Sequence, residues 1–134
     1  MQTDAIDIES LSADQLIRQL KTGLPIKSFD NLKTKLELTD ISLAQIVQIP
    51  KRTLNRRRLQ GRFNTDESER VLRLAQVYDM AIAVFESQEK AKSWLKKPAR
   101  GLGGKIPLEY ADTYIGANEV IKLLGRIDQG VFPG

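Results

Sequence analysis

The chain contains no cysteine and no histidine among its 134 residues. Without cysteine it can form neither a disulfide framework nor a thiolate metal site. Without histidine it lacks the commonest general base and the commonest metal ligand. No convincing acid–base pair of Asp, Glu, Lys or Tyr takes their place. We therefore expect a protein that is not an enzyme, with no catalytic residues, no metal and no cofactor.

Long hydrophobic runs are also missing. No apolar stretch approaches the ~20 residues that a membrane span needs. The first ten residues, MQTDAIDIES, are acidic and lack the basic-then-apolar pattern of a signal peptide. We expect a cytoplasmic protein with no membrane partner. The length fits one domain, or two very small ones that share a core.

Positive charge is concentrated in residues 51–62, KRTLNRRRLQGR, which hold six Lys and Arg side chains and no acid. The whole chain has 21 basic and 17 acidic residues, so removing these six leaves 15 basic against 17 acidic, a net charge of −2. This count assigns the surplus positive charge to a single segment. A focused basic patch suits a polyanionic partner.

Apolar residues recur at helical spacing along nearly the whole chain, which predicts an all-α fold of seven or eight helices. Residues with capping side chains divide the pattern into segments. The final helix is expected over about residues 117–129, with Gly130 as its stop. The expected helix starts are Ser12, Ser28, Ser42 with Gln45, Asn64 with Glu67, and Ser87.

The segment PARGLGGKIP, residues 98–107, is rich in glycine and proline but matches no nucleotide-binding pattern. A phosphate loop would need glycine where Ala99 stands and Ser or Thr where Ile106 stands. No strand precedes the segment. It is therefore predicted to be a connecting loop.

Two short helices are expected at residues 42–48 and 51–60, joined by a tight turn, and the second is basic. This arrangement is typical of a helix-turn-helix DNA-binding module. An ordinary helical hairpin whose charges are merely solvated is the alternative. Helical geometry separates the two, because a DNA-reading helix must direct some of its cations away from the core.

At 100° per residue, Leu54 is the apolar residue of residues 51–60 that must face the core. Arg52 and Arg56 then lie on the opposite, outward face, where Arg can bind guanine or phosphate. Leu59 also points outward and could contact a thymine methyl group or a second subunit. The candidate DNA-binding residues are Lys51, Arg52, Asn55, Arg56 and Arg62.

Arg57 and Arg58 lie toward the inward side of the same helix. We expect both to pair with acids at the start of the following helix, among them Asp66, Glu67 and Glu69. They are therefore excluded from the DNA-binding set.

A long helix is expected from about Thr65 to Glu86, with apolar residues around much of its circumference. Such a helix is either wrapped by its own domain or buried in a subunit interface. Because helix-turn-helix proteins commonly dimerise on palindromic sites, we favour a homodimer. The apolar stripe consists of Val71, Leu74, Ala75, Tyr78, Ile82 and Phe85, with Leu72, Val77, Met80 and Val84 elsewhere on the helix.

Four ordered pieces together resemble the Xre/MbcA/ParS-type antitoxins, the partners of RES-domain toxins, over about residues 28–134. The pieces are IPKRTLNRRRLQGRFNTDESERVLRLAQV, AKSWLKKP, GLGGKIPLE and GANEVIKLLGRIDQGVF. The last is the most specific. Pro50 departs from the family pattern, which usually has a capping Ser before the reading helix, and Asp128-Gln129 replaces a more common acid–histidine pair.

The resemblance implies an Xre-like helix-turn-helix module fused to a small helical toxin-binding domain. It implies an antitoxin that binds its own operator DNA and neutralises a RES-domain, NAD-consuming toxin by placing its C-terminal tail in the toxin's active site. On this basis the chain divides into residues 1–27, an N-terminal segment with one short helix; 28–63, the DNA-binding module; and 64–134, a dimerisation and toxin-binding domain.

Two large apolar residues, Val131 and Phe132, stand just before the final Pro-Gly, although termini are commonly polar and frayed. If Phe132 is an anchor in a partner's pocket, its aromatic ring is a common kind of binding hot spot. The alternative is that these side chains fold back onto the protein's own core. The candidate toxin-binding residues are Arg126, Ile127, Val131, Phe132 and Gly134.

Two rival functions remain at this point. The first is a stand-alone helix-turn-helix repressor whose C-terminal half only dimerises. The second is an enzyme, in which any metal would have to be held by carboxylates alone.

Overall fold

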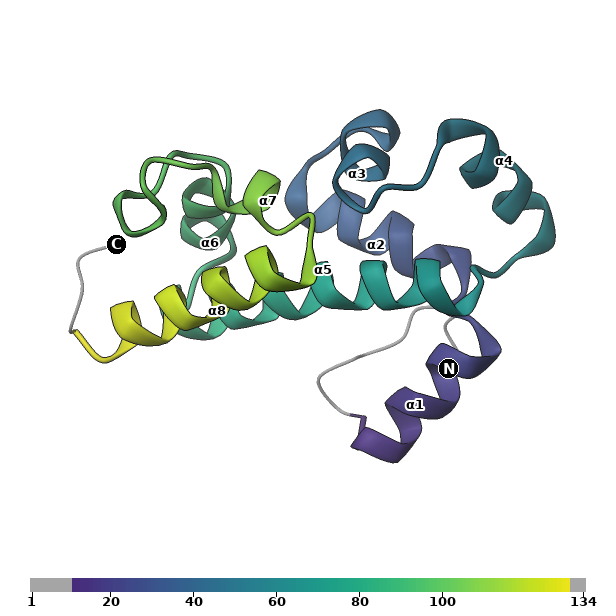
Figure 1. The fold of residues 1–134 in the computed structure, drawn as a ribbon, viewed down its shortest axis with the longest axis horizontal. Helices are drawn as coiled ribbons and strands as arrows, with labels where there is room; N and C mark the ends of the chain where they lie inside the picture. The colour runs from purple at the N-terminus through teal and green to yellow at the C-terminus, as the bar shows by residue number, and fades with distance from the viewer. Residues whose placement is uncertain (1–10, 131–134) are drawn as a thin grey trace. The chain divides into compact units, whose positions relative to one another are not determined.

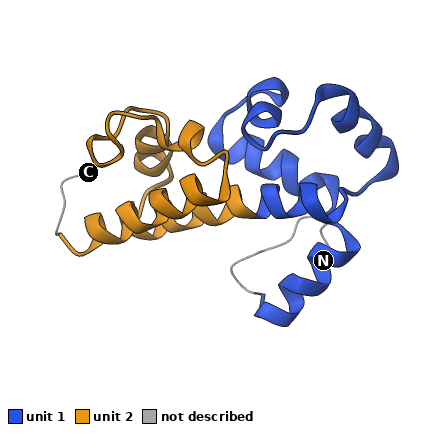
Figure 2. Ribbon diagram, viewed as in Figure 1, with its two compact units in different colours: residues 1–72 blue, residues 73–134 orange. Residues whose placement is uncertain are grey.

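The computed structural model describes residues 11–130, and over that range the chain is all-helical, as predicted (Figure 1). Eight α-helices and one short 3₁₀ segment follow one another along these residues. The chain forms two compact units, residues 1–72 and 73–134 (Figure 2). The division falls inside the long helix α5, whereas the sequence places a domain boundary before that helix, between residues 63 and 64.

Unit 1 contains four complete helices and the beginning of a fifth. Its core is built from the apolar faces of these helices and of the turns between them; each large side chain buried there contributes about 2 kcal/mol relative to exposure. The rings of Phe29 and Phe63 pack with their centroids 6.1 Å apart. The helices are α1 (Ala13–Thr22), α2 (Ile26–Leu36), α3 (Asp40–Ile46), α4 (Lys51–Gln60) and the first turns of α5 (Thr65–Phe85). The largest buried side chains are Leu24, Phe29, Leu36, Leu43, Leu54 and Val71.

Two of the predicted helix starts in unit 1 are confirmed. Ser12 caps α1 and forms a reciprocal capping box with Gln15. At the start of α5, the Glu67 backbone N–H donates to the Asn64 side chain at 2.8 Å, and the Asn64 N–H donates to the Glu67 carboxylate at 2.9 Å. Each box satisfies backbone donors that would otherwise lack partners in the first turn.

Two other predicted starts are wrong. Helix α2 begins at Ile26, after Pro25, and Ser28 lies buried within its first turn. Helix α3 begins at Asp40 because Thr39, rather than Ser42, accepts the first capping hydrogen bond. In both cases an earlier residue of suitable conformation was available, and the spacing of Ser residues alone did not reveal it.

The turn after α1 is fixed by contacts with the beginning of α5. The Leu24 backbone N–H donates to the Ser68 hydroxyl at 2.8 Å, and the Leu24 carbonyl accepts from Phe63 at 2.9 Å. Gly23 has a φ of 100°, and a Cβ added there would overlap the carbonyl oxygen of Phe63. Only glycine fits this position without a shift of the backbone.

Unit 2 contains the rest of α5, two further short helices and a longer final one. Helix α7 contacts both α6 and α8, and the 3₁₀ segment η2 also contacts α8. The elements are α6 (Gln88–Leu95), η2 (Arg100–Leu102), α7 (Pro107–Tyr110) and α8 (Tyr114–Asp128). The core includes Val77, Ala81, Ala91, Leu95, Leu108, Ala117, Val120, Leu123 and Leu124.

Helix α8 begins three residues earlier than the sequence predicts, because the side chain of Thr113 accepts a hydrogen bond from the Gly116 N–H at 2.9 Å. Gly116 itself is buried, and a Cβ there would overlap the backbone carbonyl oxygen of Tyr110. The predicted stop is confirmed: Gly130 has a φ of 71°, and its N–H donates to the Ile127 carbonyl.

The connecting segment at residues 98–107 is confirmed as a turn that carries η2. The backbones of Ala99 and Lys105 pair in an isolated bridge, and Gly103 and Gly104 adopt positive φ angles between them. Pro107 then opens α7.

Helix α5 buries much of its apolar surface within this single chain. The predicted stripe residues Val71, Leu74 and Tyr78 are buried. Leu72 and Val77, which the sequence analysis assigned to other sides of the helix, are buried too. Neither α5 nor any other helix within residues 11–130 is both long and apolar enough to cross a bilayer.

Candidate functional site

The two short helices predicted to form a helix-turn-helix pair contact each other. Helix α4 has the predicted bounds, residues 51–60, whereas α3 runs from Asp40 to Ile46. Between them Gln48 adopts a left-handed conformation with a φ of 58°, and Ile49 is buried. Pro50 directly precedes α4 without a side-chain cap; its carbonyl accepts the first helical hydrogen bond from Leu54 at 2.9 Å.

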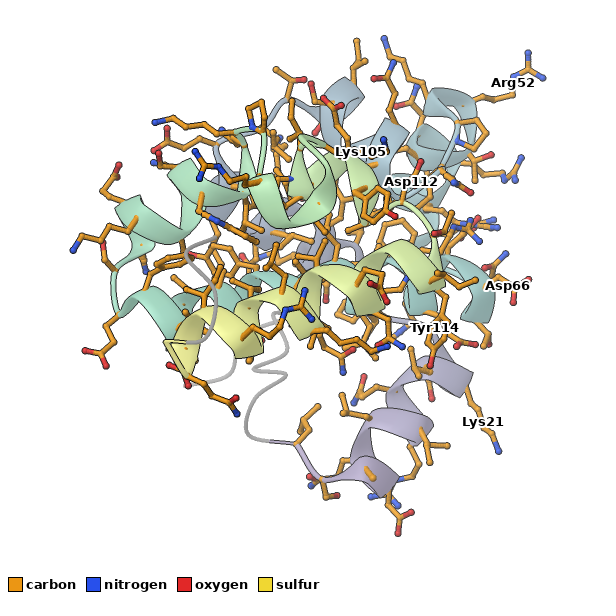
Figure 3. The ribbon with its side chains drawn as sticks, turned by 60° about the vertical axis from the view of Figure 1, so that its left-hand side comes forward. Lys21, Arg52, Asp66, Lys105, Asp112 and Tyr114 are labelled. Atoms are coloured by element: carbon orange, nitrogen blue, oxygen red, sulfur yellow. The ribbon has the colours of Figure 1, made fainter. Side chains whose placement is uncertain are left out.

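Helix α4 sorts its side chains as the helical geometry predicts. Leu54 is buried in unit 1, and Leu59 is 91% exposed. Arg52 projects from α4 away from the ribbon (Figure 3). Within the described part of the chain, no side-chain hydrogen bond or ion pair occupies the exposed residues Lys51, Arg52, Asn55 and Arg56.

Arg57 forms the predicted ion pair with an acid at the start of α5. Its Nε and Nη2 donate to the two carboxylate oxygens of Glu67 at 2.7 and 3.0 Å. Burial favours a raised pKa for Glu67, but the hydrogen bonds from Arg57 and from the Asn64 backbone outweigh it. The pKa of this carboxyl therefore lies below its usual range. The Glu67 side chain is only 8% exposed, so this bidentate pair fixes α4 to α5 in a place shielded from water.

The predicted partner of Arg58 is wrong. Instead of an acid on α5, its guanidinium contacts both carboxylate oxygens of Asp30 at 3.0 Å and one oxygen of Asp40 at 3.1 Å. It also lies over the Phe29 ring, with its central carbon 5.8 Å from the ring centroid. These acids belong to α2 and α3, which helical periodicity along α4 alone could not identify.

Asp40 therefore receives two cations. A hydrogen bond from Lys33 at 2.9 Å lowers the pKa of Asp40, and the charge of Arg58 acts in the same direction; together they outweigh the opposing effect of burial. The carboxylate thus connects α2, the start of α3, and α4.

Arg62, which the sequence analysis grouped with the DNA-binding residues, forms a contact within unit 1. Its Nη1 donates to the carbonyl oxygen of Gly23 at 2.7 Å, and the backbones of Arg62 and Pro25 form an isolated bridge. Arg62 therefore differs from Lys51, Arg52 and Arg56, because its guanidinium already stabilises the turn after α1.

The predicted toxin-binding residues lie at the end of the chain. Arg126 and Ile127 are half-buried in the last turn of α8. Val131, Phe132 and Gly134 lie outside the described residues. No group of three or more acidic side chains that could hold a metal ion occurs within residues 11–130.

Sequence reasoning missed an open groove of about 590 Å³ in unit 2. Its apolar lining is aromatic and includes Phe85 and Trp94, whose ring centroids lie 5.7 Å apart. The signal that could have revealed it is a second stretch without acids, residues 90–105, which contains the only Trp of the chain. The groove is lined by Phe85, Glu89, Lys90, Ser93, Trp94, Lys97 and Pro98.

The α3–α4 pair, with its outward cations and its inward ion pairs, defines a helix-turn-helix protein that carries an additional helical unit. Comparison with known protein families assigns both parts. Residues 15–76 match the antitoxin Xre-like helix-turn-helix domain, and residues 80–130 match the antitoxin Xre/MbcA/ParS C-terminal toxin-binding domain.

Similar proteins agree with this assignment. The chain is 35% identical over 119 residues to an antitoxin Xre of Yersinia enterocolitica, covering 87% of this chain and 80% of that one. It is 34% identical over 128 residues to an antitoxin Xre of Photorhabdus laumondii, covering 94% and 86%. A protein of a Sphingobium species named Prs ADP-ribosylating antitoxin is 28% identical over 123 residues, covering 84% and 77%. The chain belongs to the Xre antitoxin family.

Proposed function

We propose that this protein is the antitoxin of a type II toxin–antitoxin pair, that it neutralises a RES-domain toxin, and that it represses its own operon by binding operator DNA through α4. The observation that carries the DNA-binding half is the division of cations on α4. Arg57 and Arg58 fix the helix to unit 1, whereas Arg52 and Arg56 extend outward with no partner in the described part of the chain. A helix held in this way can present its outer face to the major groove.

Within this proposal the outward residues have different roles. Arg52 and Arg56 carry the planar guanidinium that can bind guanine through two hydrogen bonds, and Asn55 can bind adenine in the same manner. Lys51, at the beginning of α4, suits a phosphate contact. Leu59 offers an apolar contact to a thymine methyl group.

The double variant Arg52→Ala with Arg56→Ala tests the DNA-binding half. We expect weaker operator binding and a salt dependence whose slope falls by about one for each phosphate that the variant no longer neutralises. Toxin neutralisation should persist. The matched control is Arg18→Ala with Lys21→Ala on α1, which changes the net charge by the same amount. Mobility shifts that are the same for wild type and variant across a salt series would exclude α4 as the reading helix.

Support for the toxin-binding half comes from the match of residues 80–130 to a toxin-binding domain and from the four sequence pieces that resemble partners of RES-domain toxins. We propose that the tail, with Val131, Phe132 and Gly134, enters the toxin's NAD-binding cleft. Arg126 and Ile127 would contact the rim of that cleft from the last turn of α8.

The Phe132→Ala variant tests the tail in a paired measurement. If Phe132 is an anchor, the variant should lose about 2 kcal/mol of affinity for the toxin with little change in its own melting temperature. If Phe132 instead packs on its own protein, the melting temperature should fall while the affinity for the toxin stays the same. The second result would exclude the proposed role of the tail.

We further propose that the protein acts as a homodimer in the cytoplasm, because helix-turn-helix proteins commonly pair on two-fold symmetric sites. Apolar side chains exposed at the start of α8 support a contact with a second subunit: Tyr114 is 66% exposed and Ile115 is 72% exposed. Light scattering of the purified protein would measure its mass directly.

A stand-alone repressor remains the second candidate, supported by the outward cations of α4, which require no toxin. The product of the neighbouring reading frame discriminates the two functions. For an antitoxin, that product should arrest growth when expressed alone and should co-purify with this chain at a fixed ratio.

A further inference from the structure

A second basic segment lies in unit 2. Residues 90–105, KAKSWLKKPARGLGGK, contain six Lys and Arg side chains and no acid. Removing both this segment and residues 51–62 leaves 9 basic against 17 acidic residues, a net charge of −8. The expectation that surplus positive charge lies in a single segment is therefore wrong. Each unit carries its own concentration of cations.

Two cations of this second segment lie on the groove of unit 2, and the acid Glu89 lines it as well. Lys90 and Lys97 are exposed and line the groove directly. Lys92 differs, because its side chain is only 13% exposed and its Nζ lies 3.1 Å from a carboxylate oxygen of Glu89. Lys90 lies on α6 four residues before Trp94, and Lys97 follows the end of α6 three residues after Trp94.

The positive surface continues beyond the groove along the connecting segment. Arg100 and Lys105 are exposed, and within residues 11–130 neither side chain has a hydrogen-bond or ion-pair partner. Lys105 borders a second, smaller hollow of about 290 Å³, which shares Pro98 with the groove and also includes Tyr110. The two hollows therefore meet at Pro98, and each has an acid beside its cations, Glu89 in the groove and Glu109 in the smaller hollow.

We propose that the α6 groove, formed by Phe85, Lys90, Trp94, Lys97 and Pro98, binds an acidic segment of the toxin that packs one apolar side chain against the paired aromatic rings. This inference rests on the proposed toxin-binding function and adds a contact separate from the C-terminal tail. Carboxylates of the segment would pair with Lys90 and Lys97, and further acids would face Arg100 and Lys105.

The chemistry of the groove favours a polypeptide over duplex DNA. A DNA duplex is bound through its phosphates by cations on an exposed surface and does not require an apolar pocket. An aromatic- and proline-lined groove with a charged rim is the arrangement of a protein interface, in which an anchor is buried and polar residues surround it. The groove also lies within the residues that match a toxin-binding domain.

Charge reversal at the rim tests this inference. The variant Lys90→Glu with Lys97→Glu should bind the product of the neighbouring reading frame about tenfold or more weakly, mainly through a slower association that depends on salt. The matched control is Arg18→Glu with Lys21→Glu on α1, which changes the net charge by the same amount. Lys21 extends from α1 into open space (Figure 3). The control should retain wild-type affinity within about twofold.

Trp94 provides a second readout, because it is the only tryptophan in the chain. Binding of the partner in the groove should shift the emission of Trp94, and the shift should be lost in the charge-reversal variant. If that variant fails to fold, Lys90→Gln with Lys97→Gln replaces it, with an expected loss of about threefold or more in affinity. Unfolding curves of each variant verify that its fold is intact.

The outcomes separate the two levels of the proposal. If wild type binds the partner and the folded rim variant binds it equally well, the inference about the groove is overturned and the proposed function stands. If wild type does not bind the partner at all, the proposed function fails and the inference fails with it. If the rim variant loses affinity only for a random-sequence DNA duplex, the surface is a nucleic-acid site and the inference is overturned.

Discussion

The basic side chains of the two units differ in the contacts that they make within the chain. In unit 1 four arginines form short contacts that join different elements: Arg57 to Glu67, Arg58 to Asp30 and Asp40, Arg62 to the Gly23 carbonyl, and Arg70 to the Val47 carbonyl at 2.7 Å. In unit 2, Lys92 pairs with Glu89 and Lys122 with Glu119, each within one helix at three-residue spacing.

This difference separates two uses of positive charge. In unit 1 the inward arginines give α4 a fixed orientation, and the outward ones remain available for a polyanion. In unit 2 apolar packing and one close backbone approach at Gly116 join the elements, and the exposed Lys90 of α6 has no side-chain partner in the described part of the chain. The number of basic residues therefore does not measure the surface offered to a partner. A basic side chain is available to a partner only if it does not already contact another group of the same chain.

The largest expected effect comes from removing the acid that joins α4 to α5. Glu67→Ala breaks a shielded ion pair and a capping box together, and we expect it to lower the free energy of unfolding by about 3 kcal/mol. Exposed Glu69, changed to Ala, is the matched control and should cost less than about 0.5 kcal/mol. Denaturant unfolding measures both variants. Equal losses would contradict the structural role of the Arg57–Glu67 pair.

Unit 2 should respond most to a change in packing. Gly116→Ala forces a Cβ against the Tyr110 carbonyl, and we expect a loss of about 2 kcal/mol. Gly125→Ala in the same helix meets no heavy atom within 4 Å and should be neutral or stabilising by up to about 1 kcal/mol. Hydrogen exchange should locate the loss in α7 and α8 for Gly116→Ala, and in α4 and α5 for Glu67→Ala. Exchange that rises uniformly in both variants would remove the distinction between the units.

Acidification should lower the stability of unit 1 more than that of unit 2. The loss should be smaller than in the Glu67→Ala variant, because a protonated Glu67 side chain still fills its place. The pKa values of Glu67 and Asp40 are lowered in the folded chain from ordinary values of 4.5 and 3.8. The stability they contribute is fully present above these ordinary values and is lost as the pH falls through the lowered ones. Hydrogen exchange between pH 6 and 3, with Glu67→Gln as the non-titrating control, measures this effect. A Glu67→Gln protein with undiminished acid sensitivity would show that the lowered pKa does not matter for stability.

The smallest effect distinguishes two arginines of the basic segment. Arg62→Ala removes a charged hydrogen bond to Gly23 and should cost about 1.5 kcal/mol. Arg52→Ala removes an exposed side chain and should stay within about 0.5 kcal/mol of wild type. Thermal unfolding compares the two, and DNA binding should show the reverse order. Equal stability of the two variants would show that Arg62 does not stabilise the fold, and Arg62 would then be a candidate DNA-binding residue like Arg52.

Much of unit 1 could be predicted from local sequence rules. The bounds of α4, the burial of Leu54, the outward position of Arg52 and the Asn64–Glu67 capping box depend on residues at most four positions apart along one helix. Helical periodicity contains that information directly. The Arg57–Glu67 pair was also predictable, because only one short turn separates α4 from α5.

Contacts between distant segments were not predictable in this way. The partners of Arg58 lie on α2 and α3, and the carbonyl that accepts from Arg62 lies 39 residues earlier. The α6 groove was missed for a related reason: the six cations of residues 90–105 are spread over 16 residues, whereas residues 51–62 hold six within 12. Only packing shows that Lys90 and Lys97 border one groove.

The continuous helix across the division between the units determines where the chain can be cut. A protease must draw several residues into an extended conformation, and α5 offers no loop between Thr65 and Phe85 in which that can happen. The exposed Gly103 and Gly104, in the turn between η2 and α7, are a more accessible target. A single cut there would divide unit 2 and leave unit 1 whole. A cut at that turn would therefore act on the proposed toxin-binding unit and leave α4 intact, so one polypeptide could lose its two proposed activities separately.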